Sequence, residues 1–457
     1  MSQAATDVLV AGAGAAGLAA ALSASDAGCE VVVVEARETF TSGCNTAMST
    51  SMIPAGGSRW QSQVGIEDSP GVFYQDIMAK THSQADPVVA RALTDVAPTL
   101  VAWLADSVGV PLELVTDFHY PGHARDRCHA VADRSGRTLH RHLLSELKHR
   151  ANITLITPMR LNEVTQDGPG GFGAVLATPD GSREEVRSSS VVLATNGFGA
   201  RPDLVERHIP EMADALYFGG DGSVGDALEI GHSLEAEVGF LDAYQGHGSV
   251  ATPHGILVTW ATVMHGAVLV NIDGVRFGNE TSGYSEFALP VLSQPEGMAW
   301  VVIGERIDQA CRVFADYQDL IEAKAVRWAD DAQGLATVTE MPYPPLASTL
   351  DAASEMALGR RPDPFGRTDW EQPLQPPYGA IAVTGALFHT QGGLRVDQNA
   401  TVMRRGSPLT GLYAAGGAAA GISGHGAAGY LAGNGLLSAL GLGYLAGRHA
   451  ATSEART

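Results

Sequence analysis

Three glycines near the start of the chain have the spacing of a phosphate-binding turn. Gly12, Gly14 and Gly17 form a G-x-G-x-x-G pattern between a short apolar run, residues 8–10, and an alanine-rich segment. In such a turn the first glycine permits a tight bend, the second lets the backbone approach a pyrophosphate, and the third lets a helix pack closely on the strand. The start of that helix, which includes Ala16, directs free N–H groups and a positive dipole end at the phosphates.

An acidic residue closes the same unit. The β-branched run of residues 31–34 ends on Glu35, which Ala36 follows. A carboxylate at the end of the second strand can accept hydrogen bonds from both ribose hydroxyls of a dinucleotide. A glycine triplet alone indicates little, but strand, triplet, helix, strand and acid within one unit of about 30 residues provide the expected context. The sequence therefore predicts an α/β, Rossmann-type domain with a dinucleotide at Gly12, Gly14, Ala16, Gly17, Glu35 and Ala36.

The segment that follows is small, polar and free of charge. Residues 41–51 read T-S-G-C-N-T-A-M-S-T-S. Small side chains allow a flat ring to lie against the backbone, and Asn45, Thr46 and Ser49 can donate hydrogen bonds to ring heteroatoms. A solvated loop would carry charges, and this segment has none. We therefore expect it to contact the cofactor.

Periodicity and glycine turns predict the remaining elements. Apolar residues at helical spacing predict a helix over residues 86–110. Strands are expected at 153–156, in a small meander over 163–181, at 191–194 and at 411–415, with helices at 225–234 and 434–445. Several His and Arg residues lie between His119 and His129, and we interpret that stretch as a solvated polar loop. From residue 241 the βα alternation stops, and it resumes near residue 388.

Composition excludes several classes of function. The 457 residues are 45% hydrophobic and 17% charged, as expected of a folded protein with two or three domains. A net charge of −21 argues against partners such as nucleic acid or an anionic membrane surface. The four cysteines show neither disulfide nor metal-site spacing, so we expect no metal. The first strand starts almost at once, and we expect no signal peptide and a cytoplasmic protein; residues 406–447 are too glycine-rich for a membrane span.

With these motifs in order, the chain resembles the fumarate reductase and succinate dehydrogenase flavoprotein superfamily. The resemblance is to its soluble single-chain branch, with ketosteroid-dehydrogenase-like features. It implies FAD as the cofactor, in a discontinuous glutathione-reductase-like domain with an inserted α+β capping domain. The expected divisions are 1–241 and 388–457 for the FAD domain and 242–387 for the cap. It also implies FAD contacts at Asn45, Thr46, Ser49, Ala194, Thr195, Asn196, Asp221, Gly416, Gly417, Asn434, Leu436 and Leu437.

The resemblance also implies a set of catalytic positions. Family members place one His soon after the helix that closes the first half of the FAD domain, and His247 matches that position. A second family His precedes the Gly-Gly of the returning strand, and His389 matches it. Both would polarise a substrate carbonyl or carboxylate. A packed core residue is the alternative for either histidine taken alone.

Two departures from the family concern substrate charge. Fumarate reductases carry a proton-donating Arg shortly after an R-F-x-N-E pattern. Here residues 276–280 keep the pattern, but the Arg position is Tyr284. A second family Arg, which clamps a carboxylate, is Tyr430 here, although one extra residue precedes the L-x-G-N-like segment. A phenol replaces neither the charge nor the bidentate geometry of a guanidinium. Tyr284 is therefore the expected proton-transfer residue, and Tyr430 the expected neutral donor.

Two further departures concern the cofactor. The acid that usually follows Ala-Ala-Gly and holds the ribityl chain is Gly417 here. The His that carries a covalent flavin in the membrane complexes is not present in the segment of residues 44–46. We therefore expect FAD to be bound non-covalently.

These inferences favour an FAD-dependent oxidoreductase that moves hydride between flavin N5 and a C–C bond α,β to a carbonyl, in desaturation or ene reduction. The substrate would be a small-molecule carbonyl compound or acid, with an external electron donor or acceptor, because the chain has no C-x-x-C-H or iron–sulfur cysteine set. The alternatives are a 3-ketosteroid dehydrogenase-like enzyme, a fumarate-reductase-like enoate reductase and a flavoprotein electron-transfer subunit.

Overall fold

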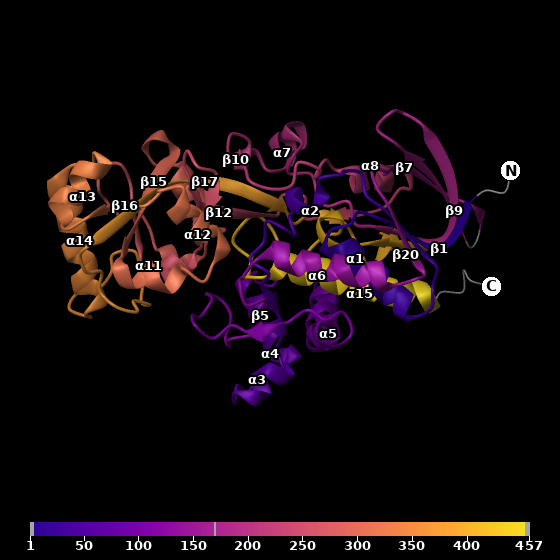
Figure 1. Ribbon diagram of the computed structural model, residues 1–457, viewed down its shortest axis with the longest axis horizontal. Helices are drawn as coiled ribbons and strands as arrows, with labels where there is room; N and C mark the ends of the chain where they lie inside the picture. The colour runs from indigo at the N-terminus through magenta and orange to yellow at the C-terminus, as the bar shows by residue number, and fades with distance from the viewer. Residues whose placement is uncertain (1–3, 169–170, 453–457) are drawn as a thin grey trace.

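The structure is a computed structural model that describes residues 4–168 and 171–452. Two lobes lie side by side along the longest axis, and each is built around its own sheet (Figure 1). The larger lobe contains the glycine turn and both ends of the described chain, and we refer to it as the dinucleotide domain. The smaller lobe is the capping domain.

The dinucleotide domain is built on an eight-stranded sheet. Its strand order is β19-β20-β9-β1-β2-β6. Strand β8 pairs with residues 183–188 of β9, before the part of β9 that pairs with β20, and β7 pairs with β8. The neighbours β20, β9, β1, β2 and β6 run parallel. The strands are β1 (Ala4–Ala11), β2 (Val31–Val34), β6 (Ile153–Ile156), β7 (Arg160–Gln166), β8 (Phe172–Ala177), β9 (Arg183–Leu193), β19 (Thr401–Arg404) and β20 (Ser407–Ala414). The parallel α/β sheet confirms the predicted fold class.

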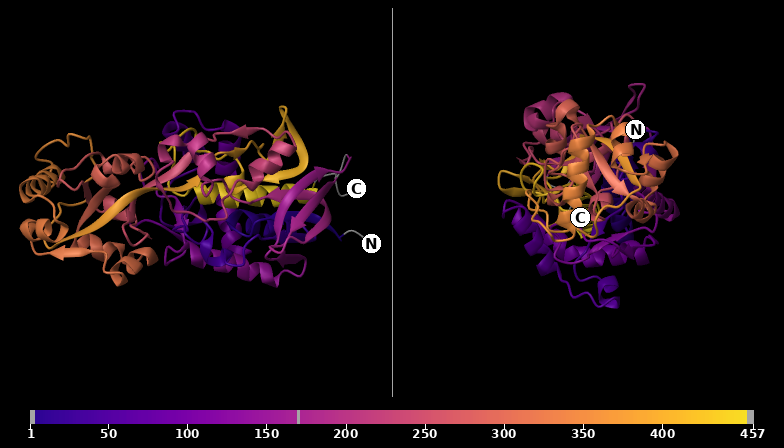
Figure 2. Two further views of the ribbon diagram at one scale, coloured as in Figure 1. Left: turned by 90° about the horizontal axis from the view of Figure 1, so that it is seen from above. Right: turned by 90° about the vertical axis from the view of Figure 1, so that its left-hand side faces the viewer.

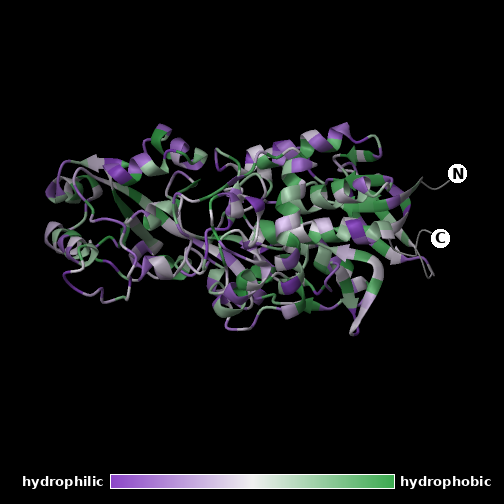
Figure 3. Cartoon of the chain, turned by 90° about the horizontal axis from the view of Figure 1, so that it is seen from below, coloured by the Kyte–Doolittle hydropathy of each residue, from purple (hydrophilic) through white to green (hydrophobic). Residues whose placement is uncertain are grey.

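Small residues allow two helices to pack closely together beneath this sheet. Helix α1 (Ala15–Asp26) lies against α15 (Asn434–Thr452), although residues 27–433 separate them in sequence. A Cβ on Gly443 would lie 2.3 Å from Ala16 O, and one on Gly447 would lie 2.2 Å from Ala20 O, so only glycine fits at both positions. The hydrophobic segments are concentrated in this sheet and its helices, whereas hydrophilic residues lie mostly on the periphery (Figure 3).

The capping domain contains a seven-stranded sheet of order β13-β12-β17-β15-β14, with β10 and β16 also paired to β17. The strands are β10 (Leu216–Tyr217), β12 (Tyr244–Ala251), β13 (Ile256–Leu257), β14 (Val268–Val270), β15 (Met298–Gly304), β16 (Arg327–Ala329) and β17 (Tyr378–Thr390). Strand β17 extends from the cap into the other lobe (Figure 2). The predicted domain boundaries at 241/242 and 387/388 stay a proposal. Strand β17 runs across the boundary at 387/388, and β10, which precedes residue 241, pairs with β17 in the sheet of the cap.

Two small sheets and the remaining helices complete the fold. The two sheets are β3 (Ile53–Pro54), β5 (Cys128–Ala130) and β4 (Glu113–Leu114), and β11 (Val238–Gly239) with β18 (Gly393–Leu394). The helices of the dinucleotide domain are α2 (Phe40–Gly43), α3 (Arg59–Gln63), α4 (Pro70–Lys80), α5 (Pro87–Asp106), α6 (Gly136–His149), α7 (Pro202–His208) and α8 (Asp226–Ser233). Those of the cap are α9 (Ala261–Met264), α10 (Ala288–Leu292), α11 (Glu305–Cys311), α12 (Ala315–Glu322), α13 (Ala332–Thr339) and α14 (Tyr343–Ala357).

The expected elements are present, and one interpretation is wrong. The strands at 153–156 and 191–194, the meander, the helix at 86–110 and the final helix correspond to β6, β9, β7–β8, α5 and α15. The stretch from His119 to His129, however, is not a solvated loop throughout. His123, Arg127 and His129 are at most 5% exposed, because they pack against residues distant in sequence.

Among the described residues, one helix is long and apolar enough to cross a membrane by length and composition. It is α5, and it packs against α4 and α15 in the dinucleotide domain. Its apolar residues, including Leu93, Leu100 and Leu104, belong to the hydrophobic core of that domain.

Candidate active site

One large cavity of about 1210 Å³ runs from the glycine turn to the capping domain. Its lining contains all four residues for which sequence indicated a catalytic role, His247, His389, Tyr284 and Tyr430. It also contains most of the predicted cofactor residues: Gly12, Gly14, Ala16, Glu35, Ala36, Asn45, Thr46, Ser49, Ala194, Thr195, Asn196, Asp221, Gly416, Gly417 and Leu436. Residues from widely separated segments of the chain therefore meet at one site.

Three predicted cofactor residues do not line this cavity. Gly17 instead allows α1 to pack directly against the glycine turn. A Cβ at this position would lie 1.8 Å from Gly12 O, so only glycine fits. Leu437 is a core residue. Asn434 is fully buried at the start of α15. Asp221 does line the cavity, but its carboxylate is ion-paired with Arg37 at the more exposed end.

The glycine turn has the geometry that a pyrophosphate requires. Gly12 has a φ of 108°, which only glycine adopts readily, and a Cβ there would lie 2.3 Å from Ala194 O. The backbone therefore passes close to the end of the neighbouring strand β9 and leaves the N-terminus of α1 open to the cavity. Gly14 is the residue that precedes this helix.

Glu35 is held in place by the backbone on either side of it. Its Oε2 accepts a hydrogen bond from Ala13 N (2.9 Å), and its Oε1 accepts one from Arg37 N (3.0 Å). Each carboxylate oxygen can accept more than one hydrogen bond, so both keep capacity for ribose hydroxyls. The first of these bonds also links the acid directly to the glycine turn.

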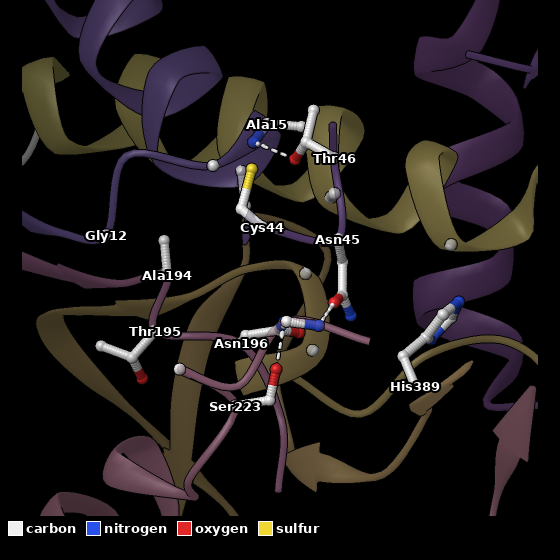
Figure 4. Close-up of a pocket in the computed structure, with 18 of the residues that line it drawn as sticks. Gly12, Ala15, Cys44, Asn45, Thr46, Ala194, Thr195, Asn196, Ser223 and His389 are labelled. Atoms are coloured by element: carbon white, nitrogen blue, oxygen red, sulfur yellow. Dashed lines mark hydrogen bonds between the residues drawn. The ribbon is translucent and has the colours of Figure 1, made fainter. Parts of the chain in front are cut away.

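The small polar segment forms one wall of the cavity (Figure 4). Thr46 Oγ1 accepts a hydrogen bond from Ala15 N (2.8 Å), at the first residue of α1. Asn45 Oδ1 accepts one from Gly220 N (2.5 Å), which leaves its amide NH₂ group as the donor. These two bonds fix the segment between the helix start and the loop at residue 220, without any charge on the wall.

The opposite wall of the cavity has no room for an acidic side chain at position 417, where the family usually has one. Asn196 has a φ of 66° and donates through Nδ2 to Ser223 Oγ (2.7 Å; Figure 4). A Cβ on Gly417 would lie 2.5 Å from Asn196 Oδ1, so no side chain fits there. The Asn196 amide therefore occupies the space that an acidic side chain at position 417 would need.

Several buried polar atoms beside the cavity have no hydrogen-bond partner among the described residues. They are Thr195 Oγ1, Ser438 Oγ and both side-chain polar atoms of Asn434. Buried polar groups are nearly always satisfied in native proteins, so atoms left without partners indicate a bound polar ligand. Thr195 and Ser438 line the cavity, so their hydroxyls fit a bound ligand with polar atoms, such as a dinucleotide.

The two histidines are brought together by adjacent antiparallel strands. His247 is on β12 and His389 is on β17, and in the register of these strands Gln245 is opposite His389 while His247 is opposite Ala386. Tyr284 is tied to the same sheet, because Gly248 N donates to Tyr284 O (3.0 Å). The strand pairing of the cap therefore sets the relative positions of three catalytic candidates.

His247 is a neutral hydrogen-bond donor. Ser249 N donates to His247 Nδ1 (3.2 Å), so Nδ1 is an acceptor and the ring proton is on Nε2. Burial lowers the pKa of His247 to about 3, so the ring is uncharged at pH 7. It stacks between Tyr284 and Phe388, with ring centroids 4.9 Å from each, and Trp260 packs against its edge.

His389 has the same protonation state. Gln391 Nε2 donates to His389 Nδ1 (2.9 Å), which again leaves the proton on Nε2. Burial lowers the pKa of His389 to about 4. Its Nε2 points at the start of α15, since a Cβ on Gly435 would lie 2.9 Å from that atom.

The two tyrosines pack against each other. Burial raises the pKa of Tyr284 well above its usual value, and raises the pKa of Tyr430 to about 12. Their rings meet edge to face, with centroids 5.9 Å apart. Tyr430 Oη accepts a hydrogen bond from Gly435 N (3.1 Å). Both hydroxyls are therefore protonated at pH 7.

Sequence reasoning missed several residues at this end of the cavity. Tyr120 lines it, and burial raises the pKa of this third phenol too, although the charge of Arg134 opposes the shift. The apolar part of the lining consists of Met52, Leu257, Trp260 and Phe388. Tyr120 lies in the stretch interpreted as a solvated loop, and neither periodicity nor motif spacing distinguishes it there.

The arginines that line the cavity all belong to the dinucleotide domain. Among the described residues that line it, the basic ones are four arginines, and each is ion-paired with carboxylates of the dinucleotide domain: Arg37, Arg160, Arg183 and Arg201. Arg276 is buried between Glu280 and Asp363, and Arg395 is at the surface. The end lined by the histidines and tyrosines is therefore polar but uncharged.

Comparison with known proteins identifies the cofactor domain. Residues 7–436 match the family model described as an FAD binding domain. The chain belongs to this family. This flavoprotein is 29% identical over 451 residues to an NADH:fumarate oxidoreductase of Klebsiella pneumoniae, a match that covers 97% of the chain but only 47% of that relative. The chain thus spans about half the length of that protein.

Solved structures show the same fold. A flavocytochrome c3 fumarate reductase in its open conformation has a TM-score of 0.81 at 28% identity, covering 98% of this flavoprotein and 78% of that chain. The 3-ketosteroid-Δ4-(5α)-dehydrogenase of Rhodococcus jostii RHA1, in complex with 4-androstene-3,17-dione, has a TM-score of 0.75 at 25% identity, covering 98% and 97%. Together the matches show an FAD-binding flavoprotein and confirm the superfamily that the motifs indicated.

The geometry of Glu35 leads to a test of the cofactor site. Glu35→Ala removes the acceptor for the ribose hydroxyls, and hydrogen bonds to a charged group contribute about 1.5–3 kcal/mol. FAD affinity, measured by flavin fluorescence during dilution, should fall by about tenfold or more while far-UV circular dichroism is unchanged. Glu206→Ala, an exposed acid on α7, is the control and should bind FAD normally. Unchanged affinity in Glu35→Ala would place the ribose elsewhere.

Proposed function

We propose that this flavoprotein catalyses hydride transfer at a C–C bond α,β to an uncharged carbonyl group, by desaturation or ene reduction. The observation that carries the proposal is the end of the cavity where His247, His389, Tyr284 and Tyr430 meet. All four are neutral hydrogen-bonding groups, and no lysine or arginine among the described residues lines that end. A dicarboxylate would lose its hydration there without gaining a counter-charge, which is costly.

Two side-chain donors converge where a carbonyl oxygen can bind. Gly435 N donates to Tyr430 Oη (3.1 Å) and holds the phenol in place, and His389 Nε2 faces the same glycine. Gly435 is in the first turn of α15, a 19-residue helix whose positive dipole end is directed at this point. A carbonyl oxygen placed here could accept from the phenol and from the imidazole N–H. Such donors stabilise the negative charge that develops on the oxygen of an enolate.

The other residues that line the substrate end of the cavity favour an apolar substrate. His247 adds a third donor, with its Nε2–H directed away from Ser249. Trp260 and Phe388 flank that ring, and Met52 and Leu257 extend the apolar lining. The lining therefore suits an apolar ketone or enone better than a small acid.

Tyr284 is the group that moves the proton. When bound, FAD supplies the hydride chemistry, with its pyrophosphate at the glycine turn and its ribose at Glu35. Tyr284 then donates a proton to the α carbon in reduction; in desaturation it would accept that proton only as a phenolate, a state that its raised pKa opposes. Its raised pKa keeps the hydroxyl protonated, the state that donation requires. Its ring packs edge to face on that of Tyr430, so the proton donor lies beside the carbonyl site.

The relatives include fumarate reductases and a ketosteroid dehydrogenase. An uncharged site favours a ketone over a dicarboxylate such as fumarate. An enoate reductase that holds its carboxylate through Arg276 or Arg395 has no support, since neither residue lines the cavity. An electron-transfer subunit has no need of four converging polar groups beside the flavin site. The external electron donor or acceptor and a cytoplasmic location remain part of the proposal.

The first prediction concerns the link to the cofactor. His140 and Cys44 lie beside the flavin wall, but His140 Nε2 donates to Ala13 O (2.7 Å) and Cys44 is hydrogen-bonded to the other ring nitrogen. With both groups engaged in the protein, FAD should be released by acid or heat and appear in the supernatant. Flavin that stays with the precipitated protein would overturn non-covalent binding.

The second prediction concerns substrate charge. Under anaerobic conditions, flavin reduction or reoxidation should be followed with ketosteroids, uncharged 2-enones and 2-enoates, and with fumarate and succinate. Uncharged ketones should react at least about tenfold faster than the dicarboxylates, since each unpaired charge that enters a desolvated site costs more than 1.4 kcal/mol. Efficient reduction of fumarate would refute the proposed substrate class.

The third prediction concerns Tyr284. Tyr284→Phe keeps the ring and removes the transferable proton, so turnover should fall by about 100- to 10,000-fold. Ligand-induced changes in the flavin spectrum should persist, because His247, His389 and Tyr430 remain. Tyr343→Phe, an exposed residue of the cap, is the matched control. Near-full turnover in Tyr284→Phe would remove this residue from the mechanism.

A further inference from the structure

A buried network that the mechanism does not use connects the stretch 119–129 to the turn that carries Tyr430. Arg127 has no exposed side-chain surface and forms ion pairs with Asp68 (2.9 Å) and Asp76 (2.5 Å). Its Nη1 also donates to His123 Nδ1 (3.3 Å). His123 Nε2 in turn donates to Ala432 O (3.1 Å), across 309 positions of sequence.

These contacts fix the protonation state of His123. Its Nδ1 faces the guanidinium of Arg127, which has no acceptor atom, so Nδ1 must accept and Nε2 must carry the proton. Burial, reinforced by the charge of Arg127, lowers the pKa of His123 to about 3. The imidazole is therefore neutral at pH 7 and oriented with its only N–H toward Ala432.

Ala432 is in the middle of the turn that presents the carbonyl donors. It lies two residues after Tyr430 and three before Gly435. The turn is tightly enclosed, since a Cβ on Gly433 would lie 2.5 Å from Pro54 Cδ. Leu431 likewise packs on Gly122, beside His123, where a Cβ would lie 2.5 Å from its Cδ2.

We infer that His123 is a positioning residue. It holds the Ala432 carbonyl and thereby keeps Tyr430 and Gly435 at the spacing that lets the Gly435 N–H orient the Tyr430 hydroxyl toward a carbonyl oxygen. Arg127 orients the His123 ring, and Asp68 and Asp76 fix Arg127. The backbone of His123 also links this network to Tyr120, since His123 N donates to Tyr120 O (3.4 Å). The inference rests on the proposed role of Tyr430 and Gly435 in carbonyl binding.

The test compares variants of His123 by ligand binding. His123→Phe keeps the ring but removes the donor. His123→Gln places its amide nitrogen near the position of Nε2. In His123→Asn the side chain is about one bond shorter, so its amide nitrogen does not reach that position. The probe is 4-propylphenol, whose oxygen resembles that of an enolate, and its Kd is read from the flavin absorbance of the FAD-loaded enzyme. His119→Phe, an exposed histidine of the same stretch, is the control.

We expect His123→Phe to raise the Kd of the phenol by about tenfold, the scale of one misplaced hydrogen bond. FAD content should stay equal to that of the control, while Tm should fall by a few degrees, because two buried hydrogen bonds are lost. His123→Gln should bind within about threefold of the parent, and His123→Asn should resemble His123→Phe. The loss should be much smaller in a Tyr430→Phe background, because His123 acts through that turn.

Three results would overturn the inference: an unchanged Kd in His123→Phe, equal binding by the Gln and Asn variants, or the same loss with and without the Tyr430 hydroxyl. If His123→Phe does not retain FAD, the comparison of Gln with Asn decides. Failure of the proposed function gives a different pattern, since Tyr430→Phe alone would then bind the phenol as tightly as the parent enzyme.

Discussion

Burial without a counter-charge is the constraint on which this site depends. His247 and His389 have pKa values lowered to about 3 and 4, and the tyrosines have pKa values raised, for the same reason: no opposite charge compensates for lost hydration. The groups therefore act as neutral donors. Such donors interact most strongly with an oxygen that gains charge during the reaction, and they cannot compensate a charge that the substrate already carries.

The fold provides this arrangement by bringing rigid elements together. The strand pairing of β12 with β17 places the two histidines, and the start of α15 places Gly435 beside Tyr430. Close glycine packing between α1 and α15 joins the cofactor turn to the helix that faces the substrate. Binding of the dinucleotide and polarisation of the carbonyl therefore depend on the same pair of helices.

Sequence alone predicts the parts of the site that depend on local spacing. Gly12 and Glu35 belong to one βαβ unit, and the positions of His389 and Tyr284 follow from motifs a few residues away. The roles of His123 and Arg127 could not be predicted, because their burial depends on Ala432, Asp68 and Asp76. Tyr120 was missed for the same reason. The tautomers of the histidines likewise depend on partners, Ser249 and Gln391, that only the folded chain identifies.

The central claim is that the substrate end recognises an uncharged or enolate-like oxygen and not a carboxylate. The most direct measurement is a comparison of two ligands of matched shape, 4-propylphenol and 4-propylbenzoate, titrated into the oxidised enzyme at pH 7 and followed by flavin absorbance. The account predicts that the phenol binds at least about tenfold more tightly, because the benzoate must bring its charge into a site without a cation. Tighter binding of the benzoate would contradict the account.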